Sequence, residues 1–206
     1  MCDRTGERAT GRRIGHRAPA PQETARRAIP RSTGLRWSGG YGQGASDARG
    51  RRGGMARPAA KATLRDTQGK DVGTATFKPT KGGVQIAISV AGLSPGKHGF
   101  HVHGAGRCEP PDFKSAGPHF NPTGKQHGHK NPQGAHAGDL PNLTVGKNGK
   151  GKATFTAKGV TLGEGTGSLF STDGTSLVIH ADPDDEKTDP AGSSGARIAC
   201  GVIEKG

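Results

Sequence analysis

The stretch HGFHVHGAGRC at residues 98–108 holds three histidines within six residues and ends on a cysteine. Successive side chains of a β-strand point to opposite faces of the sheet. A strand here therefore places His101 and His103 on one face and Phe100 and Val102 on the other. Two imidazoles side by side above an apolar layer predict half of a metal site.

The basic residues divide the chain into two parts. Residues 1–57 contain 13 arginines and four acidic residues, whereas 14 of the 17 basic residues in 58–206 are lysine. The first part lacks the apolar periodicity of a packed core, so we predict a disordered extension rich in arginine, glycine and proline. The second part is the predicted folded domain, and a length of 206 residues fits one domain with such an extension.

The extension has two interpretations. An arginine- and glycine-rich arm can bind RNA, but no RGG repeat develops, and Trp37 and Tyr41 are its only strong stacking residues. The sequence favours the other interpretation, in which this segment lies upstream of the true start at Met55. Nucleic acid is therefore not an expected partner.

No signal peptide is visible and no apolar run reaches the length of a membrane span, so we expect no membrane partner.

Short segments with strand character follow one another after residue 58, separated by turn residues. In one of them, 84–90, valine and isoleucine alternate with smaller or polar residues, as in a strand with one buried face. The Asn148-Gly149 pair is typical of a tight hairpin turn. The expected strands are 61–66, 72–79, 84–90, 99–103, 142–145, 152–158, 175–180 and 197–203. This spacing predicts an all-β domain, an eight-stranded antiparallel Greek-key β-barrel or sandwich.

Two connections, 104–135 and 181–196, are too long to be simple turns. Long loops in a compact domain usually carry function or need an extra constraint. These two hold most of the remaining histidines and aspartates, and each adjoins one of the two cysteines of the domain. We therefore expect both to be functional loops.

The chemistry of a metal centre continues beyond the first two histidines. The first loop and the residues after it contain His119, His127, His129, His136 and Asp139. Three histidines and one carboxylate satisfy a tetrahedral zinc ion. Together with His101, His103 and His180 there are more ligands than one zinc ion needs, and an all-imidazole set suits copper.

Five separated motifs resemble those of the copper/zinc superoxide dismutases. They are GFHVHG, SAGPHFNP, the H…H…GDL pattern, LVIHADPDD and GARIACGVI, and they occur in the family's order over residues 60–204. The resemblance implies an oxidoreductase of antioxidant defence that converts superoxide into oxygen and hydrogen peroxide. It implies one copper and one zinc ion per subunit, and a homodimer is compatible with it.

The resemblance carries over position by position. It implies the copper ligands His101, His103, His119 and His180 and the zinc ligands His119, His127, His136 and Asp139. His119 then bridges the two ions, and a bridging imidazole must lose both ring protons, which two flanking cations make possible. Arg197 matches the arginine that attracts superoxide beside the copper, so His119 and Arg197 are the expected catalytic residues. Asp184 matches the carboxylate that links a zinc ligand to a copper ligand, and Cys108 and Cys200 match the intrachain disulfide.

Two features depart from the better-known eukaryotic pattern and look bacterial. The 181–196 loop is short and carries Lys187 as its one lysine, and EPPDFK is inserted at 109–114, before His119. Lys114 in this insertion is a candidate for steering superoxide, because positive potential at the entrance raises the rate of encounter with an anion.

Two further histidines are expected to stay outside the metal sites. His98 lies on the apolar face of its strand, so it is more typical of a hydrogen-bonded interior histidine than of a ligand. His129 is an extra histidine next to His127, and we expect it to be exposed on the loop.

Two other functions are alternatives from different classes. A dismutase-like domain could deliver copper or store zinc without catalysis, but such a domain needs no anion-attracting arginine such as Arg197. A nucleic-acid-binding role rests on residues 1–57 alone.

Without a visible signal peptide the default expectation is a cytoplasmic location, and the implied disulfide favours a periplasmic or extracellular one as the alternative.

Overall fold

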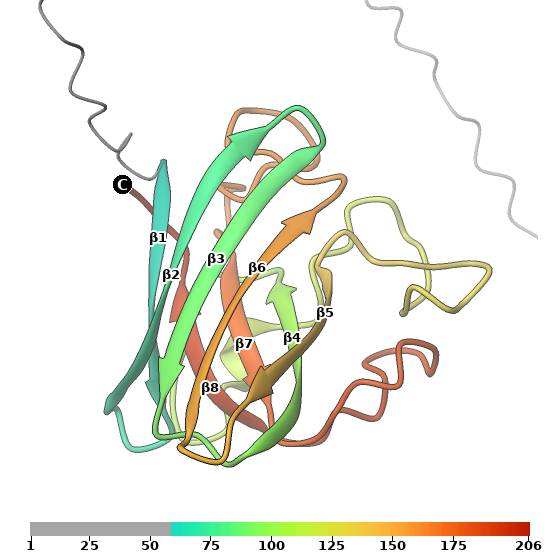
Figure 1. Cartoon of the computed structure of the whole chain (residues 1–206). Helices are drawn as coiled ribbons and strands as arrows, with labels where there is room; N and C mark the ends of the chain where they lie inside the picture. Colours follow the sequence, from blue (N-terminus) through green and yellow to red (C-terminus); the bar gives the residue numbers. More distant parts are fainter. Residues whose placement is uncertain (1–58) are drawn as a thin grey trace, which may run out of the picture. The chain divides into compact units, whose positions relative to one another are not determined.

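The computed structural model describes residues 59–206 and shows an all-β domain (Figure 1). The predicted disordered extension at 1–57 and the candidate start at Met55 lie outside the described residues. Within 59–206, no helix is both long and apolar enough to cross a membrane.

Eight antiparallel strands form one sheet that curls into a nearly closed barrel (Figure 1). The strands are β1 (Ala60–Asp66), β2 (Asp71–Thr80), β3 (Gly83–Ala91), β4 (Gly96–His103), β5 (Asp139–Val145), β6 (Lys150–Ala157), β7 (Ser176–His180) and β8 (Arg197–Val202). They lie in the order β5-β4-β7-β8-β1-β2-β3-β6. The connections from β3 to β4 and from β6 to β7 join strands that are not neighbours, as in a Greek key. The predicted all-β fold is confirmed.

Alternate side chains fill the core of the barrel. In β3, Val84, Ile86, Ile88 and Val90 are buried, and the residues between them are partly or fully exposed. β3 pairs with β2 on one side and β6 on the other without a break in register, so one apolar face extends over three strands. Burying each such side chain stabilises the fold by about 1.5–3 kcal/mol. The alternation predicted for 84–90 is confirmed.

β4 differs from β3 because it is buried on both faces. Phe100 and Val102 point into the core, where Phe100 packs on Phe155 of β6 with ring centroids 5.4 Å apart. His101 and His103 point outward and are nevertheless fully buried. The long loops after β4 and after β7 cover them, and in Figure 1 these yellow and orange-red segments lie on the same side of the barrel.

The two loops contact each other at Gly128. The backbone N–H of Lys130 donates to Glu186 O at 2.9 Å, and the two side chains form an ion pair at 3.3 Å. Gly128 has a φ of 99°, and a Cβ there would collide with the Glu186 carbonyl group. Glycine is therefore required where the loops meet.

The hairpin between β5 and β6 has the predicted tight turn. Gly149 has a φ of 71°, which glycine adopts without steric cost, and the Gly146 N–H donates to Lys150 O at 2.8 Å. The Asn148 side chain accepts from the Lys150 N–H at 3.1 Å. This hairpin brings the two ends of the sheet order side by side.

The structure also contains elements that the strand pattern did not predict. A third long loop, 158–175, connects β6 to β7. A two-residue strand, β9 (Glu204–Lys205), pairs with β1. A short 3-10 helix, η1 (Lys114–Ala116), begins at the last residue of the insertion. The third loop buries Val160 and Leu169 against the core, so packing orders it rather than metal ligands. β9 is separate from β8 because Ile203 leaves the ladder and donates to Thr175 O.

A disulfide between Cys108 and Cys200 ties the first loop to β8, which confirms the predicted pairing. Beside it, Phe113 and Ala116 pack against Val178 and Cys200 in a small apolar cluster separate from the barrel core. Phe113 belongs to the inserted EPPDFK stretch. Burial of this phenylalanine therefore anchors the insertion to the barrel wall.

We predict that replacing both half-cystines, Cys108→Ser with Cys200→Ser, lowers the free energy of unfolding by about 4–5 kcal/mol, because the bond closes a long loop. The two cysteines are 92 positions apart. Urea unfolding without reductant measures the change, with Cys2→Ser as the matched control that should leave stability unaltered. Native oxidised protein should show one titratable thiol, and three would contradict the pairing.

Candidate metal centre

Four imidazoles from three segments meet outside β4. His101 and His103 come from β4, His180 from the end of β7, and His119 from the first long loop. All four are buried, and one ring nitrogen from each lies within 4.8 Å of the others. The structure therefore brings together the four histidines expected to bind copper.

Hydrogen bonds to backbone carbonyl groups determine which nitrogen each ring presents. His103 Nδ1 donates to Gly117 O at 2.8 Å, and His180 Nδ1 donates to Gly195 O at 3.2 Å. Their Nε2 atoms are left facing each other at 3.4 Å. His101 Nδ1 is buried without a hydrogen-bond partner. Such orphaned nitrogens fit a metal ion, because a buried polar atom without a partner is costly, and an all-imidazole set suits copper.

A second cluster surrounds the carboxylate of Asp139. Its Oδ1 lies 2.8 Å from His119 Nδ1, 3.0 Å from His127 Nδ1 and 3.3 Å from His136 Nδ1. Its Oδ2 accepts from the backbone N–H groups of Gly128 and His136 at 2.9 and 3.0 Å. Three nitrogens and one oxygen converge here, and this donor set fits a tetrahedral zinc ion.

His119 belongs to both clusters. Its Nδ1 faces Asp139, whereas its Nε2 is buried without a hydrogen-bond partner. The ring lies 4.1 Å from that of His101 and 4.9 Å from that of His103, measured between centroids. One imidazole therefore presents a nitrogen to each cluster.

Asp184 connects the two clusters on the opposite side. Its Oδ2 accepts from His101 Nε2 at 2.7 Å, and its Oδ1 lies 3.0 Å from His127 Nε2. The backbone of Asp184 is held in turn by the Asn142 side chain, which accepts at 2.7 Å and donates at 2.8 Å. This carboxylate therefore orients one ring of each cluster.

The two buried carboxylates stay ionised in this environment. Burial acts to raise the pKa of Asp139, but its hydrogen bonds with His119 and His127 outweigh burial and hold that pKa well below the ordinary value. The pKa of Asp184 is lowered in the same way by its hydrogen bonds with His101 and His127. Both residues therefore supply negative charge beside the metal ligands.

The imidazoles of the first cluster are kept neutral. Burial, together with the neighbouring imidazoles, lowers the pKa of His180 to about 3 and that of His119 to about 4. Burial opposes the charged form of His127 as well, but hydrogen bonds with Asp139 and Asp184 outweigh it and raise its pKa to about 9. A metal ion bound by His127 would therefore have to displace a proton.

Arg197, at the start of β8, is half-buried beside the first cluster. Its guanidinium donates from Nη1 to Phe113 O and from Nη2 to Gly117 O, both at 2.7 Å. Gly117 O also accepts from His103 Nδ1. One carbonyl group thus fixes the arginine and a histidine of the first cluster together.

Lys114 lies near Arg197 on the surface. Both residues line an open hollow of about 500 Å³. The Lys114 ammonium group forms an ion pair with Asp112 Oδ2 at 2.7 Å, and both side chains are solvent-exposed. Solvent and Asp112 therefore weaken the field of this lysine.

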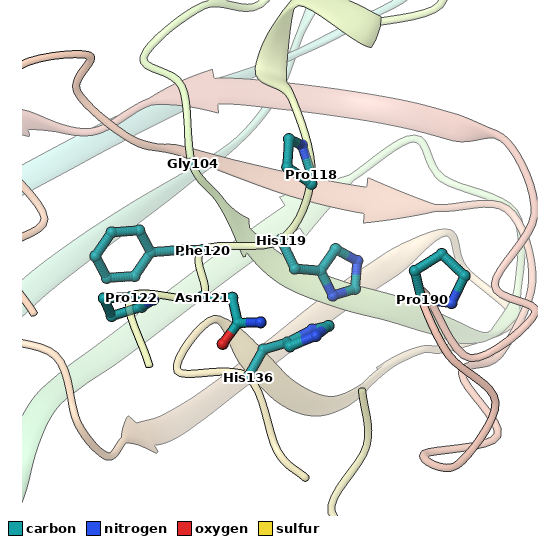
Figure 2. Close-up of a pocket in the computed structure, with 8 residues that line it drawn as sticks. All are labelled: Gly104, Pro118, His119, Phe120, Asn121, Pro122, His136 and Pro190. Carbon is teal, nitrogen blue, oxygen red and sulfur yellow. The ribbon is translucent and has the colours of Figure 1, made fainter. Parts of the chain in front are cut away.

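A second hollow, of about 410 Å³, opens beside the rings of His119 and His136 (Figure 2). Its other walls are largely apolar and include Phe120, Pro122 and Pro190. In Figure 2 the pyrrolidine ring of Pro190, from the loop after β7, lies across from the two imidazoles. Side chains from both long loops therefore border the Asp139 cluster on this side.

The remaining histidines of the domain lie outside the two clusters. His98 is buried, with Nδ1 2.8 Å from His180 O and Nε2 2.9 Å from Ser94 O. His129 is exposed on the loop. The sequence pattern did not indicate the role of Asn142, nor that of Asp189, which accepts from the His127 N–H at 2.6 Å. Asn142 lies just after the GDL motif, but a lone asparagine in a strand gave no signal of its contact.

A β-barrel with two adjoining clusters of buried metal-type ligands defines a protein that binds two metal ions. The family model described as copper/zinc superoxide dismutase matches residues 72–203. The chain is 49% identical over 146 residues to superoxide dismutase [Cu-Zn] 2 of Aquifex aeolicus, covering 70% of this chain and 85% of that one. It is 43% identical to superoxide dismutase [Cu-Zn] of Deinococcus radiodurans, covering 73% and 86%.

A solved structure shows the same fold. The crystal structure of a SOD-like protein from Bacillus subtilis has a TM-score of 0.67 and 43% identity, covering 69% of this chain and 96% of that one. The chain belongs to the copper/zinc superoxide dismutase family. It is an oxidoreductase that acts on superoxide and uses copper and zinc.

Because Asp184 contacts one ring of each cluster, we predict that Asp184→Asn weakens the binding of both metals by about 10–100-fold. The amide nitrogen would present a donor to a ring N–H group. Competition with chelators measures each affinity, and Asp182→Asn, two positions away and exposed, is the control with the same change of charge. Loss of only one metal would contradict the linking role.

Proposed function

We propose that His101, His103, His119 and His180 hold copper and that His119, His127, His136 and Asp139 hold zinc. The single observation that carries this assignment is the placement of His119. Its Nε2 lacks a partner within the first cluster, and its Nδ1 faces the carboxylate of the second. A bridging ligand needs this arrangement of its two nitrogens.

Dismutation converts two superoxide anions and two protons into one oxygen molecule and one hydrogen peroxide molecule. Copper, when bound, supplies the one-electron chemistry by cycling between two oxidation states. Zinc has no redox chemistry, so in this proposal its ligands contribute fixed geometry and charge. The chain's own residues must therefore attract the anion, orient it and supply protons.

Arg197 attracts and orients superoxide in this proposal. Two backbone carbonyl groups hold its guanidinium in place, so little side-chain entropy is lost when an anion binds. His119 Nε2, when it does not bind copper, can take up a proton and donate it to the peroxide product. Asp139, which lies 2.8 Å from Nδ1, keeps the ring aimed while this proton moves, and a zinc ion held by the second cluster would add to this restraint.

The assignment of ligands to metals predicts different losses in Asp139→Ala and His101→Ala. Removing the carboxylate should release zinc and loosen the loop, while copper-dependent activity survives in part. Removing the copper ligand should abolish turnover while zinc remains. Metal analysis with an activity assay on both purified variants tests the proposal, and equal loss of both metals and of activity in the two variants would refute it.

We propose that Lys114 assists Arg197 in steering superoxide, with Arg197 dominant because it also orients the anion. The second long loop opposes steering, since 181–196 contains five acidic residues and one lysine. Lys114 and Arg197 share the walls of one hollow, so both charges act on an anion that enters it. The ion pair with Asp112 reduces the contribution of the lysine.

Neutralising Lys114 with Lys114→Gln should lower the second-order rate by about twofold and flatten its dependence on salt. Arg197→Gln should cost about tenfold or more and also impair inhibition by small anions. Stopped-flow kinetics at several ionic strengths measures both effects, with the exposed Lys78→Gln on β2 as control. Unchanged rate and salt dependence in Lys114→Gln would make it an ordinary surface lysine.

We propose that residues 1–54 are dispensable for folding and activity, since the seven expected metal ligands and Arg197 all lie in the β domain. A chain that begins at Met55 should fold, bind both metals and retain activity. Metal content and activity of this shortened chain provide the test, and misfolding or loss of metal would contradict the proposed domain boundary.

The disulfide supports a periplasmic or extracellular location, because cytosolic thiols are normally kept reduced. Cell fractionation with an antibody to the β domain tests this proposal.

The homodimer stays a prediction, and sedimentation equilibrium of the metal-loaded protein measures the oligomeric state.

A further inference from the structure

A third hollow, of about 420 Å³, lies on the outer side of the zinc-type cluster. Its walls come from the first long loop, from the start of β5 and from the end of β6 with the residues just after it. It shares His136 with the hollow of Figure 2 and no residue with the hollow of Arg197. None of the roles assigned above uses this space.

The lining of this hollow is rich in groups that donate to anions. These are the ammonium groups of Lys125 and Lys158, the imidazole of His129 and the hydroxyl groups of Thr123 and Thr156. Within residues 59–206, neither lysine forms an ion pair. Two lysines without an ion-pair partner in this part of the chain therefore line one cavity together with three further residues that can donate.

Asp139 is the one carboxylate among the lining residues, and both of its oxygens have partners within the second cluster. Oδ1 faces three imidazoles, and Oδ2 accepts from two backbone N–H groups. Only 1% of its side chain is exposed. Neither oxygen of Asp139 is therefore free to pair with Lys125 or Lys158.

The backbone at Lys125 is held in place before any ligand binds. The side chain of Asn121 donates to Lys125 O at 2.7 Å and accepts from the Lys125 N–H at 3.0 Å. Lys158 follows directly after β6, whose pairing with β3 fixes its position. Both lysines thus project from restrained backbone, which lowers the entropic cost of closing on an anion.

We propose that this hollow binds a small oxyanion with two or more negative charges, held between Lys125 and Lys158. Lysine provides compact positive charge, and hydrogen bonds between ionised groups and donors are the strong ones. The hollow has ample room for an inorganic phosphate ion or a short dicarboxylate. A bound anion would link the loop that carries His127, His136 and Asp139 to the end of β6.

A phosphate titration tests the site. It is followed by amide NMR of the metal-loaded protein, with the copper reduced and the disulfide intact. The amide signals of residues 123–137 and 156–159, which border this hollow, should shift saturably with phosphate concentration. Any shifts at 111–117 and 195–198, near the hollow of Arg197, should follow a separate binding curve. The double variant Lys125→Gln with Lys158→Gln should weaken this binding about tenfold, whereas Lys147→Gln with Lys152→Gln, which removes the same charge from exposed sites, should change it less than about twofold. Superoxide dismutase activity should be retained in both.

A parallel titration with succinate at equal ionic strength distinguishes the source of the oxyanion, since a phosphate site should prefer phosphate and a dicarboxylate site succinate. Acetate, with one charge, should bind more weakly than both. No saturable shift in 123–137 and 156–159 with either dianion would overturn the proposal, and so would equal weakening in the two double variants. Neither result bears on the copper and zinc ligands, which the metal analyses test separately.

Discussion

A buried imidazole needs a partner at each ring nitrogen, and for the histidines of the first cluster the protein supplies a partner at only one of them. His103 and His180 each donate one N–H to a backbone carbonyl group, and His101 donates to Asp184. The other nitrogens then converge without a protein partner. Because an unpartnered buried polar atom is costly, this convergence is maintained only by the surrounding fold, and a metal ion satisfies it.

The surrounding fold supplies that restraint through contacts that serve more than one residue. The carbonyl group of Gly117 accepts from both His103 and Arg197. The same loop is tied to β8 by the disulfide and by burial of Phe113. Displacement of this loop would therefore move His103 and Arg197 together.

Strand periodicity and motif spacing predicted a large part of this architecture. Apolar alternation in 84–90 indicated a strand with one buried face, and the Asn148-Gly149 pair indicated the hairpin turn between β5 and β6. The third loop, 158–175, was missed, because its order comes from Val160 and Leu169 packing on the barrel. β9 was missed as well, since a two-residue strand has no periodicity to detect.

The sequence by itself determined the residue types of the site, the fold class and the family resemblance, because these follow from local pattern and motif order. Only the tertiary structure decided which nitrogen of each histidine is free and that Asn142 holds Asp184. It also decided that Asp112 pairs with Lys114 and that Lys125 and Lys158 face one hollow. Apart from the ion pair of Asp112 with Lys114, which is local, these facts depend on distances between residues far apart in the chain, and such distances are set by how the loops pack on the barrel.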